Sequence, residues 1–144
     1  MSEHDRAPGR VLALDLGEAR IGVAVSDPLG AVALPAGTIA VAGGVEDLKA
    51  VARLVRELDA AAVVVGHPLS LSGERGPAAR RAEEFAEGLR MLLHVPVYLQ
   101  DERLTTVQAE RDLRAAGAGG GARRLNVDRA AATLILQAFL DRPA

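Results

Sequence analysis

Residues 11 to 27 constrain the fold most, because they hold an apolar strand that ends in an acid and a glycine. Val11 to Leu16 is apolar except for Asp15, and the run stops at Gly17. A short apolar run that stops at a glycine is typical of a strand buried on both faces. A carboxylate near the end of such a strand is costly unless a cation lies beside it. Asp15 is therefore interpreted either as a cap for the turn or as a ligand for a metal ion.

The remaining sequence predicts an α/β domain with strands in both directions. Three strands follow one another closely at the start, which indicates an antiparallel meander. Later strands alternate with helices, and such units form right-handed parallel crossovers. In chain order we expect strands at 11–16, 21–26 and 31–41, a helix at 45–58, a strand at 61–66, a helix at 77–93, a strand at 95–99, and helices at 105–117 and 126–141. The prediction is a mixed five-stranded sheet flanked by helices.

Punctuating residues set the limits of these elements. Pro35 and Gly37 weaken the middle of the third strand, so we expect it at an edge of the sheet. Residues 117–124 are rich in glycine and are interpreted as a flexible tether. We expect one domain over residues 10–142 and a disordered polar tail over residues 1–9.

Composition excludes several classes of protein. The chain of 144 residues has no cysteine, so disulfides and thiolate metal sites are excluded. No apolar run approaches the roughly 18 residues that span a membrane, and the first residues lack a signal core, so we expect a cytoplasmic protein that contacts no membrane. The net charge of −2 does not by itself indicate a nucleic-acid-binding protein.

Acidic residues follow the ends of predicted elements in a pattern that suggests one site. Asp15 ends the first strand, and Asp101 and Glu102 come just after the last one. In α/β sheets, sites form outside the carboxyl ends of the parallel strands. If the first and last strands are parallel neighbours, both deliver a carboxylate to the same edge.

Asp128 lies in the first turn of the last predicted helix and shares its apolar face. It lies three, four, seven and eleven residues before four apolar residues, which are Ala131, Ala132, Ile135 and Phe139. This spacing predicts that Asp128 points toward the sheet. A charge that caps the helix start is the alternative interpretation.

Three carboxylates at one edge indicate a site for hard divalent cations. Oxygen ligands without a histidine–cysteine set favour Mg²⁺ or Mn²⁺, and one or two such ions can support cleavage of a phosphodiester bond. Arginines near the acids could bind phosphates. The arginines expected to do so are Arg20, Arg103, Arg123 and Arg124.

Other polar residues receive structural interpretations. Arg80 and Arg81 are expected to pair with Glu83 and Glu84 on a solvated helix face. His67, at the end of the fourth strand, is interpreted as a hydrogen-bonded loop histidine, with a role as proton carrier as the alternative.

Four blocks of this sequence resemble one family in order and spacing. They are "LALDLGEARIGVAVSDPLG", "VVVGHPLSLSGERGPAARRAEEFAEGL", "VYLQDERLTTVQAERDLRAAG" and "NVDRAAATLILQAFLD". Together they are similar to the YqgF (RuvX) family, bacterial proteins described as Holliday junction resolvases and as nucleases that mature the 5′ end of pre-16S ribosomal RNA. The resemblance covers nearly the whole chain from Arg10 onward.

The resemblance implies an RNase H-like fold with a metal-dependent acidic site. Asp15, Glu102 and Asp128 match the family's acidic positions and are the implied catalytic and metal-binding residues. In related RuvC-type resolvases an acid follows the fourth strand, where this chain has Gly66-His67-Pro68. Asp101 or Glu74 could therefore supply the middle ligand instead.

Three functions remain open at this stage. The first is a metal-dependent nuclease acting on pre-16S ribosomal RNA or on branched DNA, as a monomer or a homodimer. The second is an ATP-binding module, since Asp15-Leu16-Gly17 followed by Gly22 also resembles the first phosphate loop of the actin and sugar-kinase group. The third is a non-catalytic assembly factor that binds nucleic acid.

Overall fold

The structure is a computed structural model that describes residues 9–103 and 121–142, with the side chains of residues 121–130 left out. Its sheet has five strands in the order β3-β2-β1-β4-β5. The strands are β1 (Arg10–Leu16), β2 (Arg20–Ser26), β3 (Ala33–Ala40), β4 (Ala60–His67) and β5 (Val97–Asp101). β1, β2 and β3 pair antiparallel, whereas β1, β4 and β5 run parallel. The predicted meander and parallel pair are therefore confirmed, with β3 at an edge.

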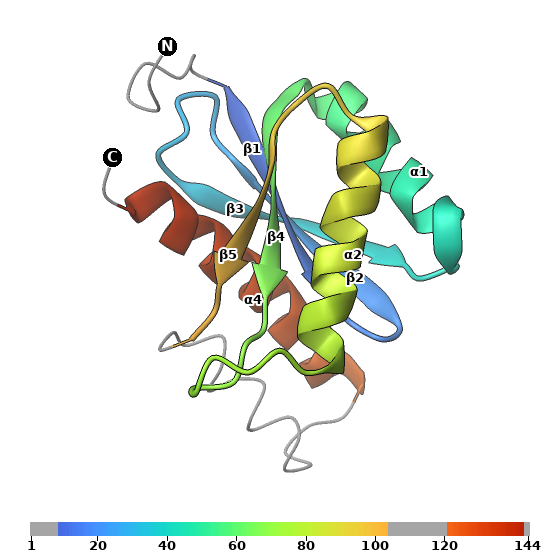
Figure 1. Ribbon diagram of the computed structural model, residues 1–144. Coiled ribbons are helices and arrows are strands. Elements are labelled where there is room, and N and C mark those ends of the chain that lie inside the picture. The colour runs from blue at the N-terminus through green and yellow to red at the C-terminus, as the bar shows by residue number, and fades with distance from the viewer. Residues whose placement is uncertain (1–8, 104–120, 143–144) are drawn as a thin grey trace.

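Helices cover both faces of this sheet (Figure 1). They are α1 (Gly44–Leu58), α2 (Pro77–Leu92) and α4 (Gly121–Asp141). α1 and α2 pack on one face, where their apolar residues join Leu12 and Leu14 of β1 in one core. α4 packs on the other face, where its apolar residues join Val11 and Ala13 in a second core. Alternate residues of β1 thus serve opposite layers, as a strand buried on both faces requires.

The apolar face predicted for the last helix is confirmed from Ala131 onward. Ala131, Ala132, Ile135 and Phe139 are all buried against the sheet. The helix itself begins at Gly121, five residues earlier than predicted, so the predicted tether is wrong from residue 121 on. Ala122 to Leu125 contains only residues with high helix propensity, which explains the extension. Asp128 consequently lies two turns inside α4 and not in its first turn.

Among the other boundaries that differ from the prediction, two bear on the site. β5 runs to Asp101, because the parallel ladder with β4 continues through Gly66 and pairs His67 with Asp101. Arg20 is the first residue of β2 and not part of the turn before it.

Several predictions lie outside the described residues. They are the helix at 105–117, the first part of the tether, and the disordered tail except for Gly9, which lies against Ala61. Within the described part of the chain, no helix combines the length and the apolar character needed to cross a membrane.

Candidate active site

Asp15 lies on the α4 face of the sheet, near the carboxyl end of β1. Its side chain follows Val11 and Ala13 in the alternation of β1, and both of these contact the core beneath α4. Asp15 is only 1% exposed. It pairs with Gly22 on β2. On β4, Gly66 is next in register after the Leu14–Val65 pair, so a glycine flanks Asp15 on each side.

Glu102 reaches the same face from beyond the end of β5. Its backbone N–H donates to the His67 carbonyl at 3.3 Å, which extends the β4–β5 ladder by one residue. Its side chain is also 1% exposed. The carboxylate lies directly over Gly66, where a Cβ would be 2.7 Å from Glu102 Oε2 and 2.6 Å from Ile135 Cδ1. Glu102 therefore lies under α4, one strand from Asp15.

The route by which these two acids approach differs from the expected one. β1 and β5 are parallel but not neighbours, because β4 lies between them. Glu102 can lie over β4 on the α4 face because Gly66 has no side chain there. Gly66 thus lies near the end of β4, where the resemblance leads us to expect an acid, and it leaves room for Glu102, which follows β5.

Substitution of Gly66 by alanine should test this arrangement. The added Cβ must displace either the Glu102 carboxylate or Ile135, since both lie under 3.0 Å from it. We expect a loss of about 1–3 kcal/mol in unfolding free energy from overpacking and a fall in cleavage rate of roughly 100-fold from misplacement of the acid. Gly76→Ala is the matched control, because a Cβ there meets nothing within 4 Å. Wild-type cleavage by Gly66→Ala would contradict the arrangement.

Asp101 does not join Asp15 and Glu102. Its carboxylate accepts from the Arg103 backbone N–H at 2.8 Å and from the Arg103 guanidinium at 2.6 and 2.8 Å. The Arg103 side chain holds the pKa of Asp101 below its usual value. By strand alternation Asp101 follows Leu99 onto the α2 face. Asp101 therefore binds and orients Arg103, whose side chain is about one-third exposed at the sheet edge.

The remaining predicted residues are placed in part. Arg20 is half-buried on the α4 face, diagonal to Asp15 across the β1–β2 ladder, where a long side chain can still reach it. Arg123, Arg124 and Asp128 belong to α4, but their side chains lie outside the described part of the chain. Glu74 is exposed in the loop after β4, and its backbone carbonyl accepts from Ser70.

Asp15 and Glu102 fit a hard divalent cation. Both donors are carboxylate oxygens, both are buried, and the absent side chain of Gly66 lets the Glu102 carboxylate lie over β4, one strand from Asp15. A divalent cation favours the charged form of the carboxylates that bind it. Among the described side chains, no group of three or more His, Cys, Asp or Glu residues is arranged to hold a metal ion.

A second polar cluster lies on the α2 face of the same edge, and local sequence rules do not predict it. Glu83 of α2 contacts His67 Nε2 at 2.6 Å and accepts from Arg75 Nε at 2.9 Å and Arg75 Nη2 at 2.5 Å. Arg75, together with His67, lowers the pKa of Glu83 to about 2. The hydrogen-bonded histidine is confirmed, but the pairing of Glu83 with Arg80 or Arg81 is wrong.

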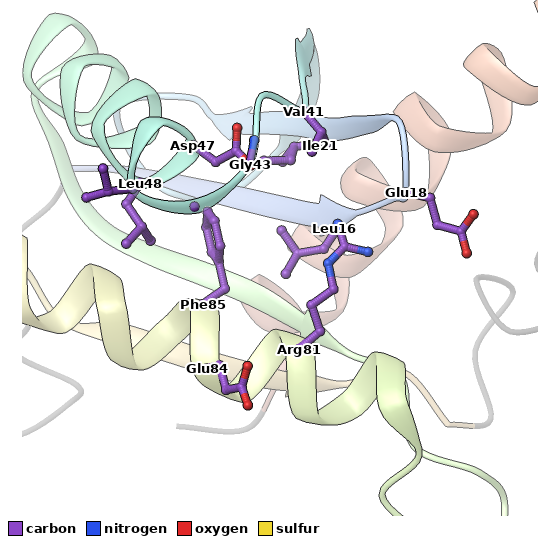
Figure 2. Close-up of a pocket in the computed structure, with 12 residues that line it drawn as sticks. Leu16, Glu18, Ile21, Val41, Gly43, Asp47, Leu48, Arg81, Glu84 and Phe85 are labelled. Carbon is purple, nitrogen blue, oxygen red and sulfur yellow. The ribbon is translucent and has the colours of Figure 1, made fainter.

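Arg81 points away from Glu83 to the opposite side of α2. Its guanidinium donates to the Gly17 carbonyl. Figure 2 shows Arg81 beside Leu16 in a pocket of about 640 Å³ between α1, α2 and the β1–β2 turn. Ile21 and Phe85 are among the apolar residues that line this pocket. It lies on the α1–α2 face of the sheet and is separate from the buried acids.

The mixed five-stranded sheet, with helices on both faces, defines an α/β protein of the RNase H-like class. A solved structure described as T. thermophilus RuvC in complex with Holliday junction substrate has this fold. It matches with a TM-score of 0.55 over 90% of this chain and 93% of that chain, at 18% sequence identity.

The chain belongs to the RuvX family, whose profile is described as Holliday junction resolvase and matches residues 9–142. A protein of Thermobifida fusca (strain YX) is 53% identical over 90% of this chain and 86% of its own length. One of Roseiflexus sp. (strain RS-1) is 46% identical over 93% of this chain and 95% of its own length. Both carry the name "Putative pre-16S rRNA nuclease".

Proposed function

We propose that this chain is a divalent-metal-dependent nuclease that acts in the cytoplasm on precursor 16S ribosomal RNA. The observation that carries the proposal is the pair of buried carboxylates, Asp15 and Glu102, on the α4 face beside Gly66. The fold and the names of the family relatives agree with it.

Asp128 is the third proposed ligand, by its position in the helix. Ala131 and Ile135 of α4 are buried, and Ile135 lies over Gly66 beside Glu102. Residue 128 precedes these two by three and seven positions, which places it on the same face of a regular helix. In Figure 1 α4 begins toward the edge where β1 and β4 end. Asp128 is therefore proposed to approach Asp15 and Glu102 from above the sheet.

The roles of these residues follow from their placement. Asp15, Glu102 and Asp128 would hold Mg²⁺ or Mn²⁺, and Arg20, Arg103, Arg123 and Arg124 would bind phosphates along the substrate. A bound cation would act as a Lewis acid, which activates water as a nucleophile and stabilises the departing oxygen. The buried sheet face fixes the Asp15 and Glu102 carboxylates, so little reorganisation is needed when substrate binds.

Branched DNA is the second candidate substrate, because the family profile is described as Holliday junction resolvase. A junction resolvase cuts symmetrically and needs a two-fold dimer, whereas a nuclease that trims RNA can act as a monomer.

A cleavage assay with purified protein separates these functions. The substrates are precursor 16S RNA, single-stranded RNA and a four-way DNA junction, each with and without Mn²⁺. We expect Mn²⁺-dependent cleavage of the precursor at its 5′ side. Symmetric cutting of the junction alone would favour the resolvase, and binding without cleavage of any substrate would favour a non-catalytic assembly factor.

A further inference from the structure

The loop between β4 and α2, residues 68–76, is closed by hydrogen bonds between its own residues. Within the loop, the Ser70 N–H donates to the Glu74 carbonyl at 3.2 Å, and the Gly73 N–H donates to the Ser70 carbonyl at 2.9 Å. The Ser70 hydroxyl accepts from the Glu74 N–H at 3.0 Å. These bonds close the loop into a compact turn, so an anchor at one point positions all of it.

Glu83 supplies that anchor from α2. Its carboxylate binds the Arg75 guanidinium through three contacts of 2.5 to 3.1 Å and binds His67 on its other side. Arg75 is the loop's own residue, and His67 ends β4, so Glu83 joins the loop to both the helix and the sheet. Because a guanidinium binds a carboxylate through two parallel hydrogen bonds, the pair fixes the orientation of both side chains as well as their distance.

The anchored loop lies against Arg103. A Cβ at Gly73, where φ is +88°, would be 3.2 Å from Arg103 Nη1. The other side of the guanidinium is bound by Asp101, which pairs in register with His67. Arg103 is therefore held between Asp101 and the loop, immediately after the proposed metal ligand Glu102.

We propose that Glu83 is a positioning residue that, through Arg75, holds loop 68–76 against Arg103 and so presents the Arg103 guanidinium to a phosphate of the substrate. This inference rests on the proposed function, because it assigns Arg103 a nucleic-acid phosphate. Glu83 itself contacts no substrate, and its loss should act through Arg103.

A label on the loop tests the anchor without any substrate. Leu71 is 70% exposed on the loop, and the chain has no cysteine, so Leu71→Cys takes a single nitroxide. Glu83→Ala and Arg75→Ala should each increase the mobility of that nitroxide, and Glu83→Gln, which keeps a hydrogen-bond acceptor, should restore part of the order. Glu87→Ala is the matched control, since Glu87 is a glutamate one turn along α2 that pairs with Arg90 of the same helix. Equal mobility in Glu83→Ala and Glu87→Ala would overturn the anchor.

Binding of a fluorescent precursor 16S RNA fragment in EDTA tests the positioning. We expect Arg103→Ala to weaken RNA binding by a similar factor whatever the RNA sequence. The slope of the binding constant against salt concentration, both on logarithmic scales, should fall by about one released counterion. Glu83→Ala should do the same, and the double variant should be no weaker than Arg103→Ala alone. Additive losses, or a salt dependence that Glu83→Ala leaves unchanged, would overturn the positioning role alone. Failure of the wild-type chain to bind RNA in EDTA would overturn the positioning role, and loss of Mn²⁺-dependent cleavage as well would overturn the proposed function. The nitroxide mobility tests the anchor in either case.

Discussion

Replacement of Asp15 by asparagine is expected to abolish phosphodiester cleavage and to leave the fold intact. Asparagine has nearly the same shape, so the buried site at the end of β1 stays filled. It loses the negative charge that a divalent cation requires from a hard oxygen ligand. We expect the cleavage rate to fall at least ~1000-fold, which corresponds to about 4 kcal/mol of transition-state stabilisation.

Asp128→Asn should give the same loss, and Asp101→Asn should give a much smaller one. Asp101 lies on the other face of the sheet and binds Arg103, for which asparagine still offers a hydrogen-bond acceptor, so it is the acidic comparison from the same edge. Circular dichroism and thermal melting of each variant would show whether the fold is retained. Undiminished cleavage by both Asp15→Asn and Asp128→Asn would refute the assignment.

Truncation of Phe139 to alanine is expected to give the largest loss of stability. Phe139 of α4 is fully buried, and its ring lies 5.3 Å from that of Tyr98 on β5. The Arg142 guanidinium covers the ring at 3.9 Å from its centroid. Removal of a buried phenyl group leaves a cavity and costs about 3–5 kcal/mol.

Denaturant unfolding at equilibrium measures this loss. Met91→Ala is the matched control, because Met91 is 83% exposed and its truncation should change the unfolding free energy by less than about 0.5 kcal/mol. The same Phe139 variant should bind divalent cations more weakly, since α4 carries the proposed ligand Asp128. An unfolding free energy within 1 kcal/mol of wild type would show that α4 is not held on the sheet as described.

The layered fold could be predicted from the sequence because its signals are local. Apolar runs such as Val11–Leu16 identify strands buried on both faces, and the spacing of Ala131, Ile135 and Phe139 identifies the buried face of α4. The early start of α4 was missed because three glycines before Ala122 indicate a tether more strongly than the residues after them indicate a helix.

The sequence identified the acidic residues of the candidate site but not how they are arranged in space. Strand order was needed to show that β4 separates β1 from β5, and no local pattern reveals that Gly66 leaves room for Glu102. The pairing of Glu83 was missed for a related reason. Neighbouring arginines suggested a helix-surface pair, whereas its partners Arg75 and His67 come from the loop and from β4.

An anomalous difference map from crystals soaked in Mn²⁺ would examine the proposed metal centre itself. A peak should appear on the α4 face of the sheet, within bonding distance of carboxylate oxygens from residues 15, 102 and 128. If instead Mn²⁺ at concentrations that support cleavage binds elsewhere and leaves those three side chains uncoordinated, the enzymatic account of this chain is wrong.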